Sequence, residues 1–361
     1  MPPPQLDGYT YLGELGTGGY ADVYLYEQTR PRRRVAVKVL LAAGLTDARR
    51  AQFTAEADLM ALVSAHPYIV TIFAADVAAD GRPYLVMEYY PRPHLGVRAA
   101  AERLSVPEVL RIGVQLAGAV ESAHRLGILH HDIKPANVLT SQFGRPGLTA
   151  FGIAATVGQP ADDDDRGGMS IPWSAPEVFR ADGEPDERSD VYALGATVWH
   201  LLAGRSPFDV PGADNRPLAM MRRIETERLA GTGRDDVPAS LERALEQAMR
   251  KKPVGRFASA YDFALALQAI QQELQLAVTP VELPESTPIR PRGPGGAAFT
   301  DAGATRFKPL TVESHPGGVP ASRDAPPIAA TMGRPAAAVI TEPVEIVAVS
   351  EPRPHQRRRA L

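Results

Sequence analysis

One short stretch, "HHDIKPANVL" at 130–139, holds three side chains with complementary chemistry. Asp132 can accept a proton, Lys134 can contact a phosphate, and the amide oxygen of Asn137 can bind a metal ion. The stretch follows a long expected helix and leads into an expected strand, so it is a loop at an element boundary, where catalytic groups are common. A plain polar turn would not need this combination, and we interpret the stretch as a candidate catalytic loop.

A second candidate is Lys38, in the expected strand "VAVKVL", together with Glu56 in the helix that follows. Lys38 shares a strand face with Ala36, and an inward-pointing ammonium needs an anionic partner. Of the 39 Lys and Arg residues five are lysine, and the first 250 residues contain just Lys38 and Lys134. Two lysines in a chain that otherwise uses arginine favour phosphate contact over a solvated edge lysine.

A glycine-rich stretch, "GTGGYADV" at 16–23, lies between two expected strands. Glycine lets the backbone fold closely over phosphate groups and present its N–H groups to them. Alone this signal is weak, because Ala21 stands at the third glycine of a Gly-x-Gly-x-x-Gly pattern and an ordinary glycine-rich hairpin is an alternative. A dinucleotide-binding turn is disfavoured because a strand follows the loop instead of a helix.

Two halves of different secondary structure would position these residues. Short runs rich in Val, Tyr and Leu, broken by Gly or Pro, predict strands in roughly the first 90 residues. The predicted strands are 9–16, 21–28, 33–41 and 82–90. One helix, at 46–63, interrupts them, and its apolar face is expected to contain Phe53, Ala57, Leu59 and Leu62.

The sequence after Leu104 predicts mainly helices, the first of them capped by Ser105. Clear apolar-rich helical segments are 105–127, 188–204 and 259–276. We therefore predict an α+β, two-lobed fold over 9–276, with a small β-rich lobe at about 9–90 and a larger helical lobe at about 91–276. Such an arrangement is typical of proteins that bind a ligand in a cleft.

The remainder, 277–361, is predicted to be a disordered Pro-rich tail or linker, flexible after about Val278. Fourteen of the 34 prolines lie after Val278, and the short apolar pieces there have no sustained period, so burial cannot offset chain entropy. The last residues, "PRPHQRRRAL", resemble the cytoplasmic flank of a membrane helix. We expect membrane association if the native chain continues past Leu361, and a plain basic terminus otherwise.

Composition narrows the functional classes. The formal net charge of -3 argues against a nucleic-acid binder that works by bulk charge. The absence of cysteine excludes disulfides and thiolate metal sites and suits a reducing compartment. No signal peptide is apparent, and no stretch reaches the ~18 apolar residues of a membrane span. We expect a cytoplasmic protein, either free or as the cytoplasmic part of a membrane-anchored one.

Taken together, the motifs resemble the protein-kinase signature set in order and spacing. They are the glycine-rich loop, Lys38 in "VAVK", Glu56, "HHDIKPAN", "AFG" at 150–152 and "APE" at 175–177. Lys134 within "DIKPAN" is typical of the Ser/Thr type, and the chain is similar to the bacterial members of the eukaryotic-type Ser/Thr protein kinases. The segment "GMSIPWSAPE" resembles a peptide-docking segment, which disfavours a small-molecule phosphotransferase.

The resemblance implies a role for each matching residue, with ATP and Mg²⁺ as cofactors. Lys38, oriented by Glu56, would hold the α- and β-phosphates. Asp132 would accept the proton of the substrate hydroxyl, Lys134 would steady the γ-phosphate, and Asn137 would bind one Mg²⁺. The other residues expected to bind nucleotide are Gly16, Thr17, Gly18, Gly19, Val23, Ala36, Met87, Glu88, Tyr90 and Leu139.

The resemblance also implies contacts that support the catalytic loop. Asp190 lies in the helix that is expected to anchor this loop. Arg256 is expected to pair with Glu177 of the "APE" motif. Ser170 stands where a threonine usually contacts the catalytic aspartate and lysine.

One departure from the family pattern is His131, which replaces an arginine that usually reads a phosphate on the activation segment. That segment has a single hydroxyl, Thr156, before Ser170, and four aspartates at 162–165. We favour a solvated acidic loop tip over carboxylates that stand in for a phosphate, because the arginine reader is missing. Switching by phosphorylation of the middle of the segment is not expected.

The other departure is Ala150, which stands where the family carries the aspartate that binds magnesium. A methyl group cannot bind Mg²⁺, so nucleotide binding is expected to survive while transfer falls by roughly 10²- to 10⁴-fold. Two hypotheses remain, namely a slowed Ser/Thr kinase that acts on protein substrates and an inactive pseudokinase that holds nucleotide and docks partners. The otherwise complete catalytic set favours the first.

Overall fold

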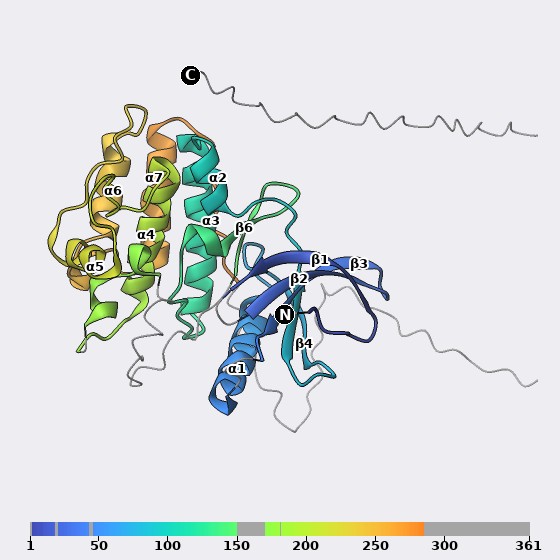
Figure 1. Ribbon diagram of the computed structural model, residues 1–361. Coiled ribbons are helices and arrows are strands. Elements are labelled where there is room, and N and C mark those ends of the chain that lie inside the picture. Colours follow the sequence, from blue (N-terminus) through green and yellow to red (C-terminus); the bar gives the residue numbers. More distant parts are fainter. Residues whose placement is uncertain (1, 19–20, 43–45, 150–169, 181, 285–361) are drawn as a thin grey trace, which may run out of the picture. The chain divides into compact units, whose positions relative to one another are not determined.

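A computed structural model describes residues 2–18, 21–42, 46–149, 170–180 and 182–284 of the 361-residue chain (Figure 1). Four of the features singled out in the sequence lie outside these residues: Gly19, Ala150, Thr156 and the aspartates at 162–165. The predicted tail from residue 285 onward lies outside them as well. All of the described residues belong to one compact unit.

The first half of the described chain forms a five-stranded antiparallel sheet with the order β1-β2-β3-β5-β4 (Figure 1). Its strands are β1 (Tyr9–Thr17), β2 (Ala21–Gln28), β3 (Arg33–Leu40), β4 (Ile72–Val77) and β5 (Pro83–Glu88). The sequence did not indicate β4, which is an edge strand, is largely exposed and includes "AAD", residues that seldom favour strands. Pairing with β5 therefore holds this strand in place.

Register sorts the side chains of the sheet onto two faces. Val23 pairs with Lys38, and Ala36 pairs with Met87, so these four side chains share the inner face. The side chains of the outer face form a separate small core of Tyr24, Tyr26, Val35, Val37, Val39 and Val86. The alternation of side chains along the strands thus places Lys38 and its neighbours on one face of the sheet and the purely structural apolar residues on the other.

Residues before β1 cover this outer core. Leu6 is buried in it, the hydroxyl of Tyr26 donates to the carbonyl of Pro4 at 2.6 Å, and Arg82 donates to the carbonyl of Pro2 at 3.0 Å. We call residues 2–6 the N-terminal arm. Because the arm supplies both apolar cover and hydrogen-bond acceptors, it is an integral part of the sheet's packing.

Helix α1 (Asp47–Val63) follows β3 and packs against the sheet. Phe53, Ala57 and Met60 are buried, as the 3.6-residue period requires, whereas Leu62 is 66% exposed. The prediction for Leu62 was therefore wrong. At about 100° per residue, a position nine residues after Phe53 lies on the opposite side of the helix, so Leu62 faces solvent.

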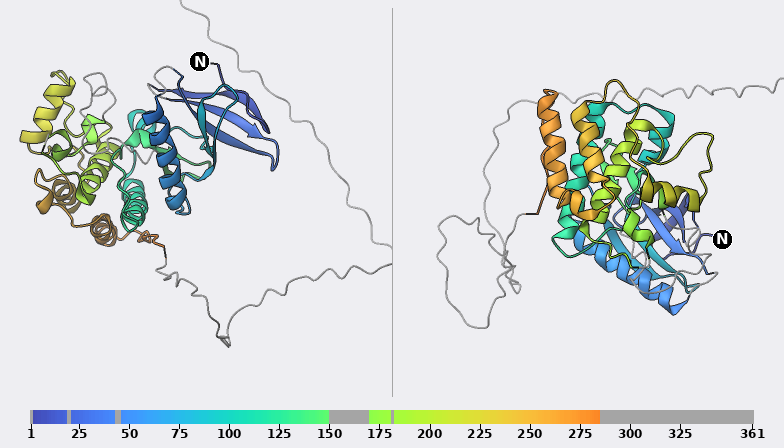
Figure 2. Two further views of the ribbon diagram at one scale, coloured as in Figure 1. Left: turned by 90° about the horizontal axis from the view of Figure 1, so that it is seen from below. Right: turned by 90° about the vertical axis from the view of Figure 1, so that its left-hand side faces the viewer.

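The second half of the described chain is mainly helical. Its helices are α2 (Leu95–Ala101), α3 (Val106–His124), α4 (Glu187–Ala203), α5 (Pro217–Thr226), α6 (Ala239–Ala248) and α7 (Ala260–Glu273). Between them lie the strand pair β6 (Val138–Thr140) and β7 (Pro146–Leu148), and 3-10 turns at Pro135–Asn137, Ile171–Trp173, Pro176–Phe179 and Pro253–Gly255. Helices α3, α4, α6 and α7 lie side by side (Figure 1 and Figure 2).

Helix α3 is the centre of this half. Nearly every residue of α3 is buried, and the helix contacts both α4 and α7. Ser105 accepts the N–H of Glu108 at 3.3 Å and so caps the helix, as predicted. The predicted α+β fold with a β-rich lobe and a helical lobe is confirmed. No helix in the described part of the chain has the length and apolarity to cross a bilayer.

Helix α7 ends in a turn that sends the chain back across the helical lobe. Gln275 adopts a left-handed conformation with φ of 55°. The N–H of Leu276 donates to the carbonyl of Gln271 at 2.8 Å, and the N–H of Gln275 donates to the carbonyl of Gln272 at 2.9 Å. These two bonds are the Schellman pattern, in which glycine usually occupies the left-handed position. The described chain continues in contact with the helices as far as Glu282, so the folded part extends beyond Leu276, where we expected it to end.

We expect Gln275→Gly to stabilise the protein by about 0.5–1 kcal/mol. Glycine removes the ~1–2 kcal/mol steric cost of the left-handed conformation, and its greater freedom in the unfolded chain cancels part of that gain. Urea unfolding measures the effect. Gln272→Gly is the control, since the same change inside the helix should destabilise by about 1 kcal/mol, and a loss of stability in both variants would contradict the prediction.

Candidate active site

The catalytic loop predicted from "HHDIKPAN" brings its polar side chains together around Asp132. The Oδ2 atom of Asp132 accepts from Lys134 Nζ at 2.9 Å and from Asn137 Nδ2 at 2.8 Å. Lys134 also donates to the hydroxyl of Ser170 at 2.5 Å. Within the part of the chain that the structure describes, Oδ1 of Asp132 has no hydrogen-bond partner.

Helix α4 holds the backbone of this loop through Asp190. The carboxylate of Asp190 accepts the N–H groups of His130 and His131 at 2.8 and 2.9 Å, and Nε2 of His124 lies 2.8 Å away. Burial alone would raise the pKa of Asp190, but the hydrogen bond and charge of His124 and the loop amides outweigh it, and the pKa lies below its ordinary value. The charged form of this buried carboxylate is thus stabilised.

His124 is a member of the site that the sequence analysis missed. It lies at the last position of α3, and its ring is almost completely buried against Asp190. The available signal was a histidine at the end of the helix that leads into the catalytic loop. His131, which we had identified as a departure from the family pattern, has a left-handed backbone with φ of 62°. The Asp190 carboxylate holds this uncommon conformation by its bond to the His131 N–H.

The predicted pair in the β-rich lobe is also present. Lys38 Nζ, on the inner face of β3, lies 2.8 Å from Glu56 Oε1 on α1. The side chains are 24% and 15% exposed, so the pair is partly screened from water but accessible to a ligand. A lysine held at one oxygen keeps N–H groups free for a phosphate.

The segment after β5 and the strand pair β6–β7 meet at Gly147. A Cβ atom built on Gly147 would lie 2.5 Å from Cζ of Tyr90, so Tyr90 packs directly against the glycine backbone. Leu139 pairs with Gly147 across the two strands, which places Leu139 and Tyr90 next to the same residue. Burial raises the pKa of Tyr90, with Glu88 adding to the effect, so Tyr90 is a neutral phenol.

The remaining expected nucleotide residues lie on the sheet. Gly16 pairs with Val23, and Thr17 pairs with Asp22, at the end of β1 that leads into Gly18. Val23 in turn lies beside Lys38, on the same face as Ala36 and Met87. The register of three strands therefore brings residues from the glycine-rich stretch, from β3 and from β5 onto one surface.

One amide oxygen is available for a metal ion. Asn137 Nδ2 donates to both the backbone carbonyl and Oδ2 of Asp132, each at 2.8 Å, and its Oδ1 has no partner among the described residues. No group of three or more His, Cys, Asp and Glu side chains that could hold a metal occurs within the described residues. A single neutral oxygen is a poor match for Mg²⁺, which prefers carboxylate and phosphate oxygens.

The helical lobe contains a buried ion pair between Glu177 and Arg256. Two bonds, of 2.6 and 2.7 Å, join the guanidinium to the two carboxylate oxygens, and Ser189 donates to Glu177 at 2.6 Å. Burial would raise the pKa of Glu177, but its bonds to Arg256 and Ser189 lower it below the ordinary value. This pair fixes the segment after Ser170 to the end of the lobe, as the "APE" motif implied.

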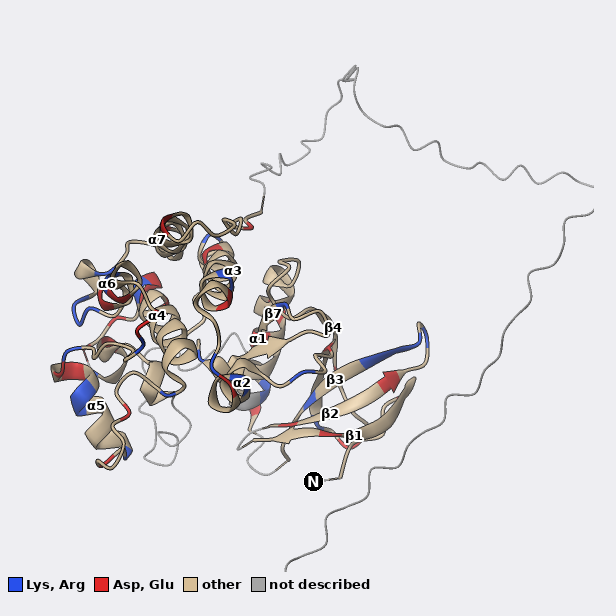
Figure 3. Cartoon of the chain, turned by 90° about the horizontal axis from the view of Figure 1, so that it is seen from above, with Lys and Arg blue, Asp and Glu red and all other residues tan. Residues whose placement is uncertain are grey.

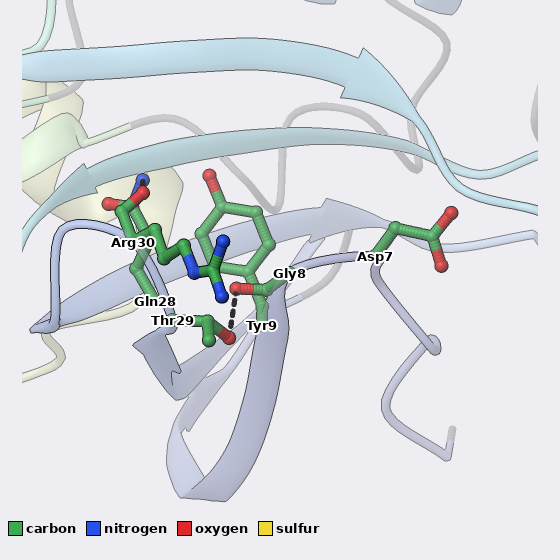
Figure 4. Close-up of a pocket in the computed structure, with 6 residues that line it drawn as sticks. All are labelled: Asp7, Gly8, Tyr9, Gln28, Thr29 and Arg30. Carbon is green, nitrogen blue, oxygen red and sulfur yellow. Dashed lines mark hydrogen bonds between the residues drawn. The ribbon is translucent and has the colours of Figure 1, made fainter.

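The described surface includes two hollows with different linings. One, of about 460 Å³, lies where β1 begins and β2 ends, and is lined by Asp7, Tyr9, Gln28 and Arg30, among others (Figure 4). It contains none of the predicted site residues, although basic side chains gather nearby at the start of β3 (Figure 3). The other lies between Asp132, Trp173 and α4, next to the candidate proton acceptor.

Comparison with known proteins agrees with this geometry. Residues 9–272 match the family model described as "Protein kinase domain". The chain is 34% identical over 330 residues to serine/threonine-protein kinase PknK of Mycobacterium tuberculosis. The aligned region covers 91% of this chain and 28% of PknK. The chain is 32% identical over 277 residues to PknF of the same species, covering 72% of this chain and 56% of that one.

A solved structure shows the same fold. The crystal structure of the Mycobacterium tuberculosis PknI kinase domain superposes with a TM-score of 0.55 and 31% sequence identity, over 73% of this chain and 97% of that one. This chain spans little more than a quarter of the length of PknK. The chain belongs to the protein kinase family and is homologous to mycobacterial Ser/Thr kinases.

Proposed function

We propose that this protein binds ATP and transfers the γ-phosphate to Ser or Thr of protein substrates, at a rate strongly reduced by Ala150. The observation that carries the proposal is the organised surrounding of Asp132, whose Oδ2 is held by Lys134 and Asn137 while Oδ1 has no partner among the described residues. A pseudokinase that had lost its chemistry would not need to keep this arrangement. The family supports ATP and Mg²⁺ as the usual cofactors.

Each of the catalytic and phosphate-binding residues that the structure describes has a defined role in this proposal. The ammonium of Lys38, fixed by Glu56, binds the phosphates of the nucleotide. The substrate hydroxyl donates to Asp132 Oδ1, which accepts its proton as the phosphoryl group is transferred. Lys134, oriented by Ser170, faces the charge that develops on the transferred group.

The described residues of the site provide few ligands for Mg²⁺. Asn137 Oδ1 would be one ligand of Mg²⁺, whose charge offsets that of the phosphates. Position 150 adds no oxygen, since it is alanine. We therefore propose that nucleotide binding relies mainly on Lys38 and the glycine-rich stretch, and that Mg²⁺ is held weakly.

The second candidate function is that of a pseudokinase, which binds nucleotide and docks partner proteins without transfer. Ala150 is the observation that favours it, because a methyl group cannot replace a carboxylate as a metal ligand. Under either function the partners we propose are proteins, and not nucleic acid. We further propose a cytoplasmic location, with membrane attachment if the native chain continues into a span after Leu361.

ATP affinity tests nucleotide binding directly. We expect Lys38→Met to weaken ATP binding by roughly 10- to 100-fold, because a charge-assisted hydrogen bond to a phosphate is worth about 1.5–3 kcal/mol. Calorimetric titration with ATP, with and without Mg²⁺, gives the value. Lys252→Met makes the same chemical change at an exposed position and should leave affinity unchanged. Equal ATP affinities of the wild type, Lys38→Met and Lys252→Met would rule out Lys38 as a phosphate ligand.

A further inference from the structure

The chain after α7 crosses the helical lobe and reaches the β-rich lobe, and we call residues 276–282 the C-terminal strap. We propose that the strap is a positioning element that fixes the loop between α1 and β4, and thereby holds Glu56 against Lys38. This inference rests on the proposed role of Lys38 and Glu56 in nucleotide binding. The strap lies outside the region matched by the family model, which ends at residue 272.

Helix α7 holds the first part of the strap by two glutamines. Gln271 accepts the N–H of Thr279 at 2.9 Å through its side-chain oxygen and donates to the Thr279 hydroxyl at 2.9 Å. Gln268 donates to the carbonyl of Thr279 at 2.7 Å. Thr279 is only 9% exposed, so all three polar groups of this residue are satisfied within the protein.

Helix α3 provides the surface that the strap crosses next. A Cβ atom built on Gly118 would lie 3.0 Å from the carbonyl oxygen of Glu282 and 3.3 Å from Cγ1 of Val281. The strap therefore approaches the helix backbone closely at a position where a side chain would interfere. Val281 packs against the main hydrophobic core, so the contact is apolar as well as close.

His66 joins the end of the strap to the loop after α1. Its Nε2–H donates to the carbonyl of Glu282 at 3.0 Å, while Nδ1 accepts the N–H of Tyr68 at 3.2 Å. Both ring nitrogens are thus used by a neutral ring, and burial lowers the pKa of His66. This bond joins residues 216 positions apart in the sequence.

The loop that His66 occupies is continuous with the end of α1. The N–H of His66 donates to the carbonyl of Val63, the last residue of α1, at 3.1 Å. Glu56 lies seven residues before Val63, or about two turns away along the same rigid helix. A strap anchored on α7 and α3 therefore restricts the end of the helix that carries the partner of Lys38.

Two substitutions at His66 separate the strap contact from the local contact. His66→Gln keeps a donor near the position of Nε2 and loses the acceptor for Tyr68. His66→Asn keeps an acceptor near the position of Nδ1 and cannot reach Glu282. Hydrogen exchange of the nucleotide-free, full-length protein reports the mobility of 64–70 and of α1, and calorimetry reports ATP affinity.

We expect His66→Asn to speed amide exchange in 64–70 and in the last turns of α1, and to weaken ATP binding about fivefold, the effect of one lost buried hydrogen bond. His66→Gln should stay close to wild type in both measurements. Gly118→Ala, which keeps or improves the helix, should reproduce the effect of His66→Asn by displacing Glu282. The double variant should be little worse than either single one, because both act on the same contact.

Three results would overturn the proposal. One is equal behaviour of the Asn and Gln variants, which would make the local Tyr68 contact the important one. Another is faster exchange confined to 276–284 with α1 unchanged. The last is faster exchange in α1 with unaltered ATP affinity, while Lys38→Met still weakens binding. If Lys38→Met itself has no effect, the proposed nucleotide role fails, and the exchange data alone decide whether the strap restrains α1.

Discussion

Ala150→Asp is expected to raise phosphotransfer by roughly 10²- to 10⁴-fold, because it supplies a carboxylate that would bind Mg²⁺, whose charge would offset that of the nucleotide phosphates. The proposed catalytic groups Asp132, Lys134 and Asn137 already contact one another in the catalytic loop. The gain should appear in turnover more than in nucleotide affinity, since the charge that the metal offsets develops during transfer. Autophosphorylation and transfer to a generic basic protein, followed with labelled ATP, measure it.

Two further variants make this result specific. Ala150→Asn adds a neutral oxygen of similar shape and should give a much smaller gain than aspartate. Asp132→Asn, added to Ala150→Asp, should abolish the gain because the proton acceptor is lost. The activity of Ala150→Asp should also depend steeply on Mg²⁺ concentration. If the Asp variant folds, binds Mg²⁺ and ATP and still transfers no phosphate, the pseudokinase function takes precedence.

Arg256→Leu is expected to destabilise the protein by about 3–5 kcal/mol, the typical cost of leaving one partner of a buried ion pair alone. The Arg256 side chain is fully buried, and Glu177 would keep only the hydroxyl of Ser189. The pKa of Glu177 lies below its ordinary value, so the stability that the pair contributes is present above the unfolded pKa and is lost as pH falls through the folded one. The difference between variant and wild type should therefore shrink in acid.

Denaturant unfolding followed by tryptophan fluorescence at several pH values checks this expectation. Arg216→Leu is the matched control, because it removes the same side chain from a pair with Asp214 that is mostly solvent-exposed. Its unfolding midpoint should stay near that of wild type at every pH. If Arg256→Leu and Arg216→Leu were equally stable, the buried pair would not hold the "APE" segment in the way that we infer.

The pattern of the sequence predicted the elements wherever one strong signal dominated. Ser105 and the apolar residues after it specify α3, and richness in Val, Tyr and Leu specifies β2 and β3. Strand β4 could not be predicted in the same way, because its small and acidic residues have weak strand preference and its position depends on β5. Leu62 was misplaced because apolar identity, and not helical angle, guided that assignment.

In the site, the motifs and the family resemblance indicated many of the residues that would meet, and some tertiary contacts remained hidden. The pattern around Asp132 was sufficient to predict its neighbours in the loop, and the need of an inward-pointing lysine for an anionic partner indicated Glu56 for Lys38. The contact of His124 with Asp190 joins two helices 66 positions apart, and no periodicity encodes it. The strap opens a Pro-rich stretch whose short apolar pieces have no sustained period, so the sequence suggested disorder, whereas glutamines of α7 satisfy the backbone groups of Thr279.

The N-terminal arm has a practical consequence for anyone who shortens the chain to its catalytic region. The matched family region begins at residue 9, so a fragment cut at that limit keeps every proposed catalytic group and discards Leu6 and the acceptor carbonyls of Pro2 and Pro4. The hydroxyl of Tyr26 would then lose its acceptor beneath a partly uncovered sheet. The melting temperature of such a fragment would therefore report the loss of the arm as well as the stability of the kinase domain itself.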